Sequence, residues 1–323
     1  MNPTLARTVK YAIACPGQGI STNGLLQAYK PFQHQFQQYL DELDSCLNCN
    51  FSQNLFANSD ISHAQEWLRK TSNAQPAIFA STYIITHLLK LRGFDIVSNA
   101  QYLMGHSLGE YTALCLSGIV DFSTGVKIVR KRGELMEEIV NKDETKKYGM
   151  SALLINPNKF DEIIGSAQEW DVLANINSHF QIVIAGEEKQ IAEFIEKCDR
   201  KLVRRGVKLP VSIPFHTSIL KSMTEELAGA FGEGLNEQQK PIISNFTGEI
   251  STNAETTVEN TIKANYQPVQ WLKSMSLLRR ENVTHVINLG PGTALHGINQ
   301  KYDNITSISV DGLDDLRELT DFI

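Results

Sequence analysis

The segment YLMGHSLGEYTALCLSG at residues 102–118 combines an apolar run, a glycine-rich turn and a helical pattern. Residues 102–104 are typical of a short buried strand, and residues 108–117 predict a helix that ends at Gly118. Between them, Gly105-His-Ser-Leu-Gly109 fits the pattern G-x-S-x-G, whose small residues allow the sharp turn that exposes a serine hydroxyl. The segment therefore predicts an α/β fold in which Ser107 lies at a strand-to-helix turn and acts as a nucleophile.

Short β-rich runs alternate with amphipathic helical patterns along the rest of the chain, which indicates the α/β class. Residues 11–15 predict a first strand, and this strand enters the turn Pro16-Gly-Gln-Gly19. Towards the end of the chain, we expect a long helix to begin at His216 and to extend to Phe231.

The middle of the chain has a different pattern, with strands predicted at 150–155, 172–176, 181–185 and 202–209 and helices at 157–167 and 187–198. That order is βαββαβ, the ferredoxin-like arrangement. We therefore predict a small domain over residues 142–212. It is inserted into a large domain formed by residues 1–141 and 213–323.

Composition excludes several classes of protein. The chain has 323 residues, of which 42% are hydrophobic and 20% charged, and a formal net charge of −6. An acidic chain with scattered basic residues is not typical of a nucleic-acid binder. The N-terminal residues lack the apolar core of a signal peptide, and no run approaches the roughly 20 apolar residues of a membrane span. We expect a soluble, cytoplasmic protein that binds neither nucleic acid nor membrane.

The cysteines give no sign of a disulfide framework or a metal site. An odd, scattered set is typical of a reducing compartment. Cys46 and Cys49 form a lone C-x-x-C with no second pair, so two free thiols are favoured over a zinc or redox site. We predict no metal site in this chain.

A nucleophilic serine needs a base, and His216 is the best candidate among eight histidines. It follows Pro214 and Phe215 at the end of an extended stretch, where its ring could face a cleft. His106 adjoins the serine, but neighbouring side chains point apart at a sharp turn, so we expect His106 to be structural. The residues alone leave the choice of base open.

Several motifs occur in a fixed order and together resemble one family. They are Pro16-Gly-Gln-Gly19, Gly105-His-Ser-Leu-Gly-Glu110, Arg132 within Lys-Arg-Gly-Glu-Leu-Met, Asn175-Ile-Asn-Ser178, Pro214-Phe-His216, a loose Asn245-Phe-Thr-Gly248, Pro268-Val-Gln-Trp271 and Gly290-Pro-Gly292. The chain thus resembles the malonyl-CoA:acyl-carrier-protein transacylases and the stand-alone acyltransferases of polyketide synthases, from Tyr11 to Tyr302. The resemblance implies an α/β-hydrolase-like large domain that carries a ferredoxin-like insertion.

The resemblance also assigns catalytic roles. Ser107 matches the nucleophile that accepts the acyl group, and His216 matches its general base. The backbone N–H groups of Gln18 and Leu108 match the oxyanion hole. Gln270 matches the residue whose main-chain carbonyl orients the histidine, so that no carboxylate of a triad is expected. The implied mechanism needs no metal, and we expect no bound cofactor.

Three further residues are expected to bind the acyl group. Arg132 matches an arginine that holds the free carboxylate of malonyl, which a planar guanidinium binds through two hydrogen bonds. Without the resemblance, Arg132 would be interpreted as one charge of a solvated Arg-Lys-Arg run. Phe215 matches a residue typical of malonyl selectivity, and Asn177 is expected at the same pocket.

The implied function is a ping-pong transfer of malonyl from malonyl-CoA to the phosphopantetheine thiol of an acyl carrier protein. We expect a monomer, although the sequence leaves the oligomeric state open. The alternatives are an acyl hydrolase or proofreading thioesterase on the same scaffold, an acyltransferase for another acyl unit, and a non-catalytic docking subunit. The sequence does not distinguish fatty-acid from polyketide biosynthesis, and it does not identify the carrier protein.

Overall fold

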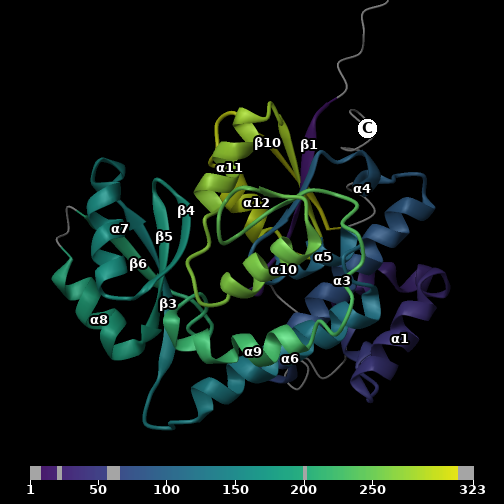
Figure 1. The fold of residues 1–323 in the computed structure, drawn as a ribbon, viewed down its shortest axis with the longest axis horizontal. Coiled ribbons are helices and arrows are strands. Elements are labelled where there is room, and N and C mark those ends of the chain that lie inside the picture. The colour runs from purple at the N-terminus through teal and green to yellow at the C-terminus, as the bar shows by residue number, and fades with distance from the viewer. Residues whose placement is uncertain (1–8, 20–23, 57–65, 199–201, 312–323) are drawn as a thin grey trace, which may run out of the picture.

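The computed structural model describes residues 9–19, 24–56, 66–198 and 202–311 and contains two β-sheets with helices packed around them (Figure 1). The larger sheet has six strands and the smaller has four. In Figure 1 the smaller sheet, with α7 and α8, lies to one side of the larger body. The predicted α/β class is confirmed.

The large sheet is mostly parallel. In spatial order its strands are β10 (Thr306–Val310), β9 (His285–Leu289), β1 (Tyr11–Cys15), β2 (Tyr102–Gly105), β7 (Ile242–Ile243) and β8 (Ile250–Ser251). Among the described strands of this sheet, only β7 and β8 pair in antiparallel fashion. The carboxyl ends of β1 and β2 therefore lie side by side, the position where α/β sheets place their ligands.

Helices cover both faces of this sheet, and strand β1 shows why. Its alternate residues belong to two separate cores, with Ile13 and Cys15 on one face and Ala12 and Ala14 on the other. A strand that is buried on both faces is a nearly continuous apolar run. The first face packs against α3 (Thr71–Leu91), α5 (Leu108–Leu116) and α6 (Phe122–Asn141), and the second against α11 (Trp271–Arg280) and α12 (Ala294–Asn299).

Shorter helices complete the large body. They are η1 (Gln27–Gln35), α1 (Gln37–Leu47), η2 (Ser52–Leu55), α4 (Ile96–Asn99), η4 (Ser218–Met223), α9 (Thr224–Gly229) and α10 (Ala254–Lys263). No helix of the described residues is both long and apolar enough to cross a bilayer.

The expected long helix from His216 to Phe231 is wrong. The chain forms a 3₁₀ turn, η4, followed by the short helix α9. His216 lies before both and has a positive φ of 64°, which is incompatible with a right-handed helix. The apolar residues Leu220, Met223 and Leu227 have helical spacing because they face one core, although the chain between them is not one continuous helix.

The small sheet has the predicted ferredoxin-like topology. Its elements follow the chain as β3 (Tyr148–Ile155), η3 (Pro157–Lys159), α7 (Phe160–Glu169), β4 (Leu173–Ser178), β5 (Gln181–Glu187), α8 (Glu188–Lys197) and β6 (Val203–Lys208). The strands lie in the order β4-β5-β3-β6 and all their pairs are antiparallel. These elements fall inside residues 142–212, whereas the exact domain boundaries remain a prediction.

The two faces of the small sheet have different roles. Leu153 and Ile155 pack under α7 and α8, whereas Met150, Ala152 and Val183 face a cavity shared with the large body. The edge strand β4 is joined to the large body through Val269, whose N–H donates to Ala174 and whose carbonyl accepts from Ile176, both at 2.9 Å. This backbone pairing fixes the small sheet over the carboxyl ends of β1 and β2.

Close packing of α6 on α3 sets the spacing of these helices beside the cavity. A Cβ added to Gly133 would lie 2.5 Å from Cα of Ser72, which is backbone and cannot rotate away. We expect Gly133→Ala to lower the free energy of unfolding by about 1–3 kcal/mol, since overpacking outweighs the better helix propensity of alanine. Urea unfolding measures this change.

Gly165→Ala in α7 is the matched control, because a Cβ there has no neighbour within 4 Å. We expect it to be neutral or to stabilise the protein by up to about 1 kcal/mol. Equal effects of the two substitutions would contradict the packing argument.

Candidate active site

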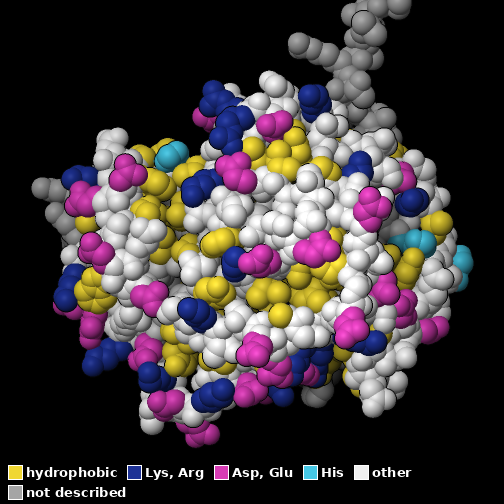
Figure 2. All heavy atoms as spheres, in the orientation of Figure 1, with side chains coloured by type: hydrophobic (Ala, Val, Ile, Leu, Met, Phe, Trp, Pro, Cys, Tyr) yellow, Lys and Arg dark blue, Asp and Glu magenta, His cyan; other side chains and the backbone are white. Residues whose placement is uncertain are grey.

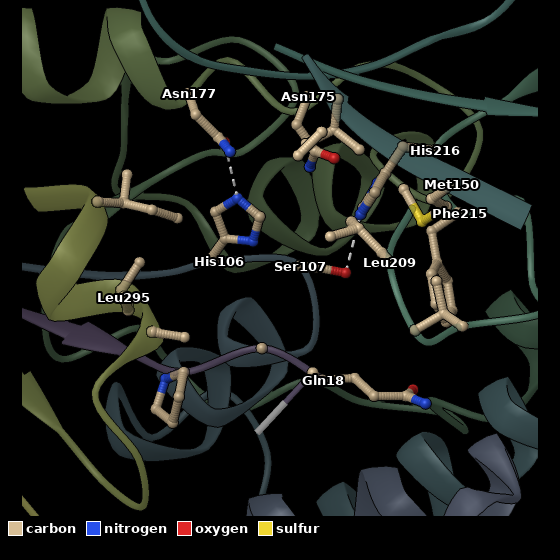
Figure 3. Close-up of a pocket in the computed structure, with 18 of the residues that line it drawn as sticks. Gln18, His106, Ser107, Met150, Asn175, Asn177, Leu209, Phe215, His216 and Leu295 are labelled. Atoms are coloured by element: carbon tan, nitrogen blue, oxygen red, sulfur yellow. Dashed lines mark hydrogen bonds between the residues drawn. The ribbon is translucent and has the colours of Figure 1, made fainter. Parts of the chain in front are cut away.

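A cavity of about 270 Å³ lies between the two bodies, and the predicted site residues other than Leu108 and Gln270 line it (Figure 3). The large body contributes the turn at 105–109 (the nucleophile turn), the turn at 16–19 after β1 and the segment before η4. The small sheet contributes the face that carries Met150, Ala152 and Val183. Residues singled out from the sequence line it, namely Gln18, Ser107, Arg132, Asn177, Phe215 and His216.

The backbone at Ser107 is held in a strained turn. Ser107 has φ 53° and ψ −108°, values that non-glycine residues rarely adopt. Gly105 and Gly109 make the turn possible, because a Cβ on Gly109 would lie 2.1 Å from the carbonyl oxygen of Cys15 and one on Gly105 would overlap Gly109. Strain of this kind is typical of a functional site.

Ser107 and His216 form a hydrogen-bonded pair. His216 Nε2 lies 2.8 Å from Ser107 Oγ, and His216 Nδ1 lies 2.6 Å from the carbonyl oxygen of Ala264 (Figure 3). A carbonyl only accepts, so Nδ1 carries the proton and Nε2 is free to accept from the serine hydroxyl. Burial lowers the pKa of His216 to about 3, although the Ala264 carbonyl opposes this shift. The imidazole is therefore neutral near pH 7, as a general base must be.

The expectation for Gln270 is wrong. The carbonyl beside His216 Nδ1 belongs to Ala264, at the end of α10. The carbonyl of Gln270 instead accepts from the N–H and the hydroxyl of Ser274, because Gln270 directly precedes α11. A contact made by a main-chain carbonyl puts no requirement on the side chain, so the sequence could not identify the residue.

The turn after β1 lies against the nucleophile turn. A Cβ on Gly17 would lie 2.6 Å from the carbonyl oxygen of His106, so the two backbones are in contact. Among the described residues, the N–H groups of Gln18 and Leu108 donate to no protein acceptor. Both remain available for an oxyanion, and their catalytic role stays a prediction.

Arg132 is buried rather than solvated. It is 1% exposed; its Nη2 lies 3.3 Å from Ser107 Oγ and its Nε donates to Asn265 Oδ1 at 2.7 Å. Its guanidinium carbon lies 5.0 Å from the centre of the Tyr111 ring. The interpretation of residue 132 as part of a solvated run is therefore excluded, although its neighbour Arg130 does form a surface pair with Glu134.

Phe215 and Asn177 line the cavity, but the Asn177 amide is already bonded to protein groups. Its Oδ1 lies 3.1 Å from His106 Nε2, and its Nδ2 donates to Gln181 at 3.3 Å. The His106 ring packs edge-on against Trp271. The structural role expected for His106 agrees with these contacts, and a direct contact of Asn177 with substrate stays a prediction.

Asn245 was not identified as a site residue from the sequence, yet it connects the turn at Ser107 to the residue before α11. Its Oδ1 accepts from the N–H of Ser107 at 2.9 Å and its Nδ2 donates to the carbonyl of Gly105 at 2.5 Å. Its own N–H donates to Glu110 at 2.9 Å, and its carbonyl accepts from the N–H of Gln270 at 2.7 Å. The only signal in the sequence was the loose Asn-Phe-Thr-Gly motif, since these partners are distant along the chain.

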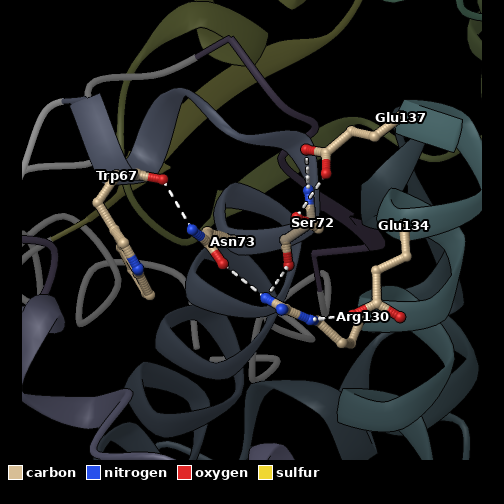
Figure 4. Close-up of polar contacts among 6 residues, drawn as sticks. All are labelled: Trp67, Ser72, Asn73, Arg130, Glu134 and Glu137. Carbon is tan, nitrogen blue, oxygen red and sulfur yellow. Dashed lines mark hydrogen bonds and ion pairs between the residues drawn. The ribbon is translucent and has the colours of Figure 1, made fainter. Parts of the chain in front are cut away.

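The start of α3 is held by side chains of α6 (Figure 4). Glu137 accepts from the N–H and the hydroxyl of Ser72 at 2.9 and 2.8 Å, and Arg130 donates to the carbonyl of Ser72 at 3.0 Å. A carboxylate at a helix N-terminus satisfies its free N–H groups. The preceding residue, Thr71, accepts from the side chain of Gln18 at 3.2 Å. This network therefore supports the turn that carries a predicted oxyanion donor.

No group of three or more His, Cys, Asp or Glu side chains in the described part of the chain could hold a metal ion. Cys46 and Cys49 are free thiols, and Cys46 lies 3.0 Å from the hydroxyl of Ser123.

Comparison with known proteins agrees with this geometry. The family model "acyl transferase domain" matches residues 14–296. A malonyl CoA-acyl carrier protein transacylase of Staphylococcus aureus is 31% identical over 95% of this chain and 97% of its own length.

Solved structures are similar over nearly the whole chain. An acyl carrier protein S-malonyltransferase from Vibrio cholerae has a TM-score of 0.85 with 27% identity and covers 96% of this chain and 99% of its own. A malonyl-transacylase in complex with its type II polyketide synthase acyl carrier protein has a TM-score of 0.84 with 26% identity, and the match covers 95% of this chain and 98% of that one. The chain therefore belongs to the acyl transferase family, among the malonyl CoA-acyl carrier protein transacylases.

Proposed function

We propose that this protein transfers malonyl from malonyl-CoA to the phosphopantetheine thiol of an acyl carrier protein, by a ping-pong mechanism through Ser107. The observation that carries the proposal is a buried arginine, Arg132, whose guanidinium lies 3.3 Å from the nucleophile oxygen in a shared cavity. The names of the similar proteins support the same activity.

In the first half-reaction Ser107 Oγ attacks the thioester carbonyl of malonyl-CoA while His216 Nε2 takes its proton. The Ala264 carbonyl, 2.6 Å from Nδ1, orients the imidazole and stabilises the imidazolium. The N–H groups of Gln18 and Leu108 stabilise the oxyanion. The carbon–sulfur bond then breaks, and the leaving coenzyme A thiolate takes the proton from His216.

In the second half-reaction the thiol of the carrier protein gives its proton to His216 Nε2 and attacks the ester on Ser107. The ester bond breaks, and Ser107 Oγ recovers the proton from His216. Every proton stays within the Ser107–His216 pair and the two thiols, so the mechanism uses no bound cofactor or metal.

Arg132 selects the acyl group. A malonyl unit carries a carboxylate a short distance from the reacting carbonyl, and Arg132 presents a desolvated positive charge beside Ser107 Oγ. Burial also lowers the pKa of Arg132, although an arginine stays protonated near neutral pH. Phe215 lies in the wall of the same cavity and limits the space for a branched acyl unit.

The alternatives fit the site less well. A hydrolase that clears ordinary acyl chains has no use for a buried guanidinium beside its nucleophile. A non-catalytic docking subunit has no use for the 2.8 Å contact between Ser107 and His216. The proposal further places the protein in the cytoplasm as a monomer, in fatty-acid or polyketide biosynthesis.

Replacement of Arg132 by alanine tests the carboxylate contact. Charge-assisted hydrogen bonds contribute about 1.5–3 kcal/mol, so we expect Arg132→Ala to lower kcat/KM for malonyl-CoA roughly 10–150-fold. Acetyl-CoA, which has no carboxylate, should lose far less. Equal losses of kcat/KM with both substrates would refute a contact between Arg132 and the malonyl carboxylate.

The acyl-enzyme can be observed directly. We expect intact-mass spectrometry, after mixing with malonyl-CoA and no carrier protein, to show one long-lived malonyl adduct, which peptide mapping assigns to Ser107. Ser107→Ala should show none. Release of coenzyme A and malonate without an adduct would favour the hydrolase.

The pH dependence of acylation tests the role of His216. The base form of His216 is present above its pKa of about 3 and is lost as the pH falls through that value. We therefore expect a nearly constant acylation rate from about pH 8 to about pH 5, measured by rapid quench. Acetyl-CoA is the control for ionisation of the malonyl carboxylate. An acid limb near the ordinary histidine pKa of about 6.5 with both substrates would contradict the assignment.

A further inference from the structure

Asn265 is the protein group that holds the guanidinium of Arg132, and no motif identified it. Its side chain is 1% exposed, and its Oδ1 accepts from Arg132 Nε at 2.7 Å. Its Nδ2 donates to the hydroxyl of Tyr111 at 2.8 Å and to the carbonyls of Thr261 and Ile262 at 3.1 and 3.0 Å. Both ends of the amide are therefore occupied.

These partners allow only one orientation of the amide. The carbonyls of Thr261 and Ile262 only accept hydrogen bonds, and Arg132 Nε only donates one. The nitrogen of Asn265 must therefore face the end of α10, and its oxygen must face Arg132.

The guanidinium is fixed in turn. Its Nε is bound by Asn265, and its face lies over the Tyr111 ring, 5.0 Å from the ring centre. With Nε bound and one face stacked, Nη2 of the guanidinium lies 3.3 Å from Ser107 Oγ. The Asn265 amide therefore determines which edge of the guanidinium faces the acyl pocket.

The contact with Asn265 brings no negative charge to Arg132. Among the ion pairs formed by the described residues, none includes Arg132. The nearby carboxyl of Glu110 is itself buried and accepts from the N–H of Asn245. Burial raises the pKa of Glu110 to about 8, although Asn245 and the charge of Arg132 oppose this shift, so the carboxyl is mostly protonated at pH 7.

A neutral partner is what carboxylate selection requires. An aspartate at position 265 would pair with Arg132 and compete with the substrate, and it would also set an oxygen against two main-chain carbonyls. We propose that Asn265 is a specificity-determining positioning residue, whose neutral amide orients Arg132 towards the acyl group and leaves its charge for a substrate carboxylate. This inference rests on the proposed malonyl transfer.

The same segment also holds the general base, but only through its backbone. The carbonyl of Ala264 faces His216 Nδ1, and the carbonyl of Asn265 accepts from the N–H of His216 at 3.1 Å. A substitution of the Asn265 side chain keeps both carbonyls. Carboxylate selection and nucleophile activation can therefore be separated by experiment.

The test measures kcat/KM for Ser107 acylation with malonyl-CoA and with acetyl-CoA. The variants are Asn265→Ala and Asn265→Leu, whose leucine side chain fills more of the space of the asparagine. We expect the malonyl-to-acetyl ratio to fall about tenfold in both, the scale of a lost hydrogen bond to a charged group. Acetyl loading reports whether each variant is folded and keeps its Ser107–His216 pair. Asn260→Ala, a half-buried change in α10 shortly before Asn265, is the matched control and should keep the ratio.

A double-mutant cycle separates positioning from a general structural role. In an Arg132→Ala background, Asn265→Ala should leave the ratio unchanged. If the malonyl-to-acetyl ratio of the Asn265 variants stays at the wild-type value, because neither or both substrates lose rate, the inference about Asn265 is overturned. The proposed function is then unaffected. Absence of malonyl loading in the wild type would overturn the proposed function and this inference with it.

Discussion

The rest of the site depends on the strained backbone of Ser107. Its φ of 53° brings the serine hydroxyl out of the sheet, and the turn persists because close packing leaves no room for another path. Asn245 bonds to both sides of this turn, at the carbonyl of Gly105 and the N–H of Ser107. Because the same residue also bonds to Gln270, the turn is tied to the start of α11 and through it to the opposite face of the sheet.

Two buried asparagines therefore hold different groups in place around Ser107. Asn245 holds the nucleophile turn, whereas Asn265 holds the guanidinium and contributes its carbonyl to the backbone of His216. Both are buried and hydrogen-bonded at both ends of the amide, the condition under which a polar group in a core specifies one arrangement. The small sheet closes the cavity from the other side, and its pairing with Val269 keeps that wall in place.

Local signals in the sequence predicted two parts of the fold correctly. Apolar periodicity and turn residues predicted the βαββαβ module, and the G-x-S-x-G pattern predicted a turn that the glycine packing explains. They failed where backbone geometry overrides a pattern, as at His216, whose positive φ prevents the expected helix. Local signals also failed where a main-chain carbonyl makes the contact, as at Ala264. They failed again where the contact joins residues distant in sequence, as between Asn265 and Arg132. Such contacts exist only after folding.

The central claim is that one cavity activates Ser107 and binds the carboxylate of the acyl group it accepts. A crystal structure of the malonyl-loaded enzyme tests it most directly. The account predicts the malonyl carboxylate within hydrogen-bond distance of the Arg132 Nη atoms, at about 2.7–2.9 Å, with Nε still on Asn265 and the ester carbonyl at the N–H groups of Gln18 and Leu108. A malonyl carboxylate that points to solvent, with Arg132 still on Ser107 Oγ, would contradict it.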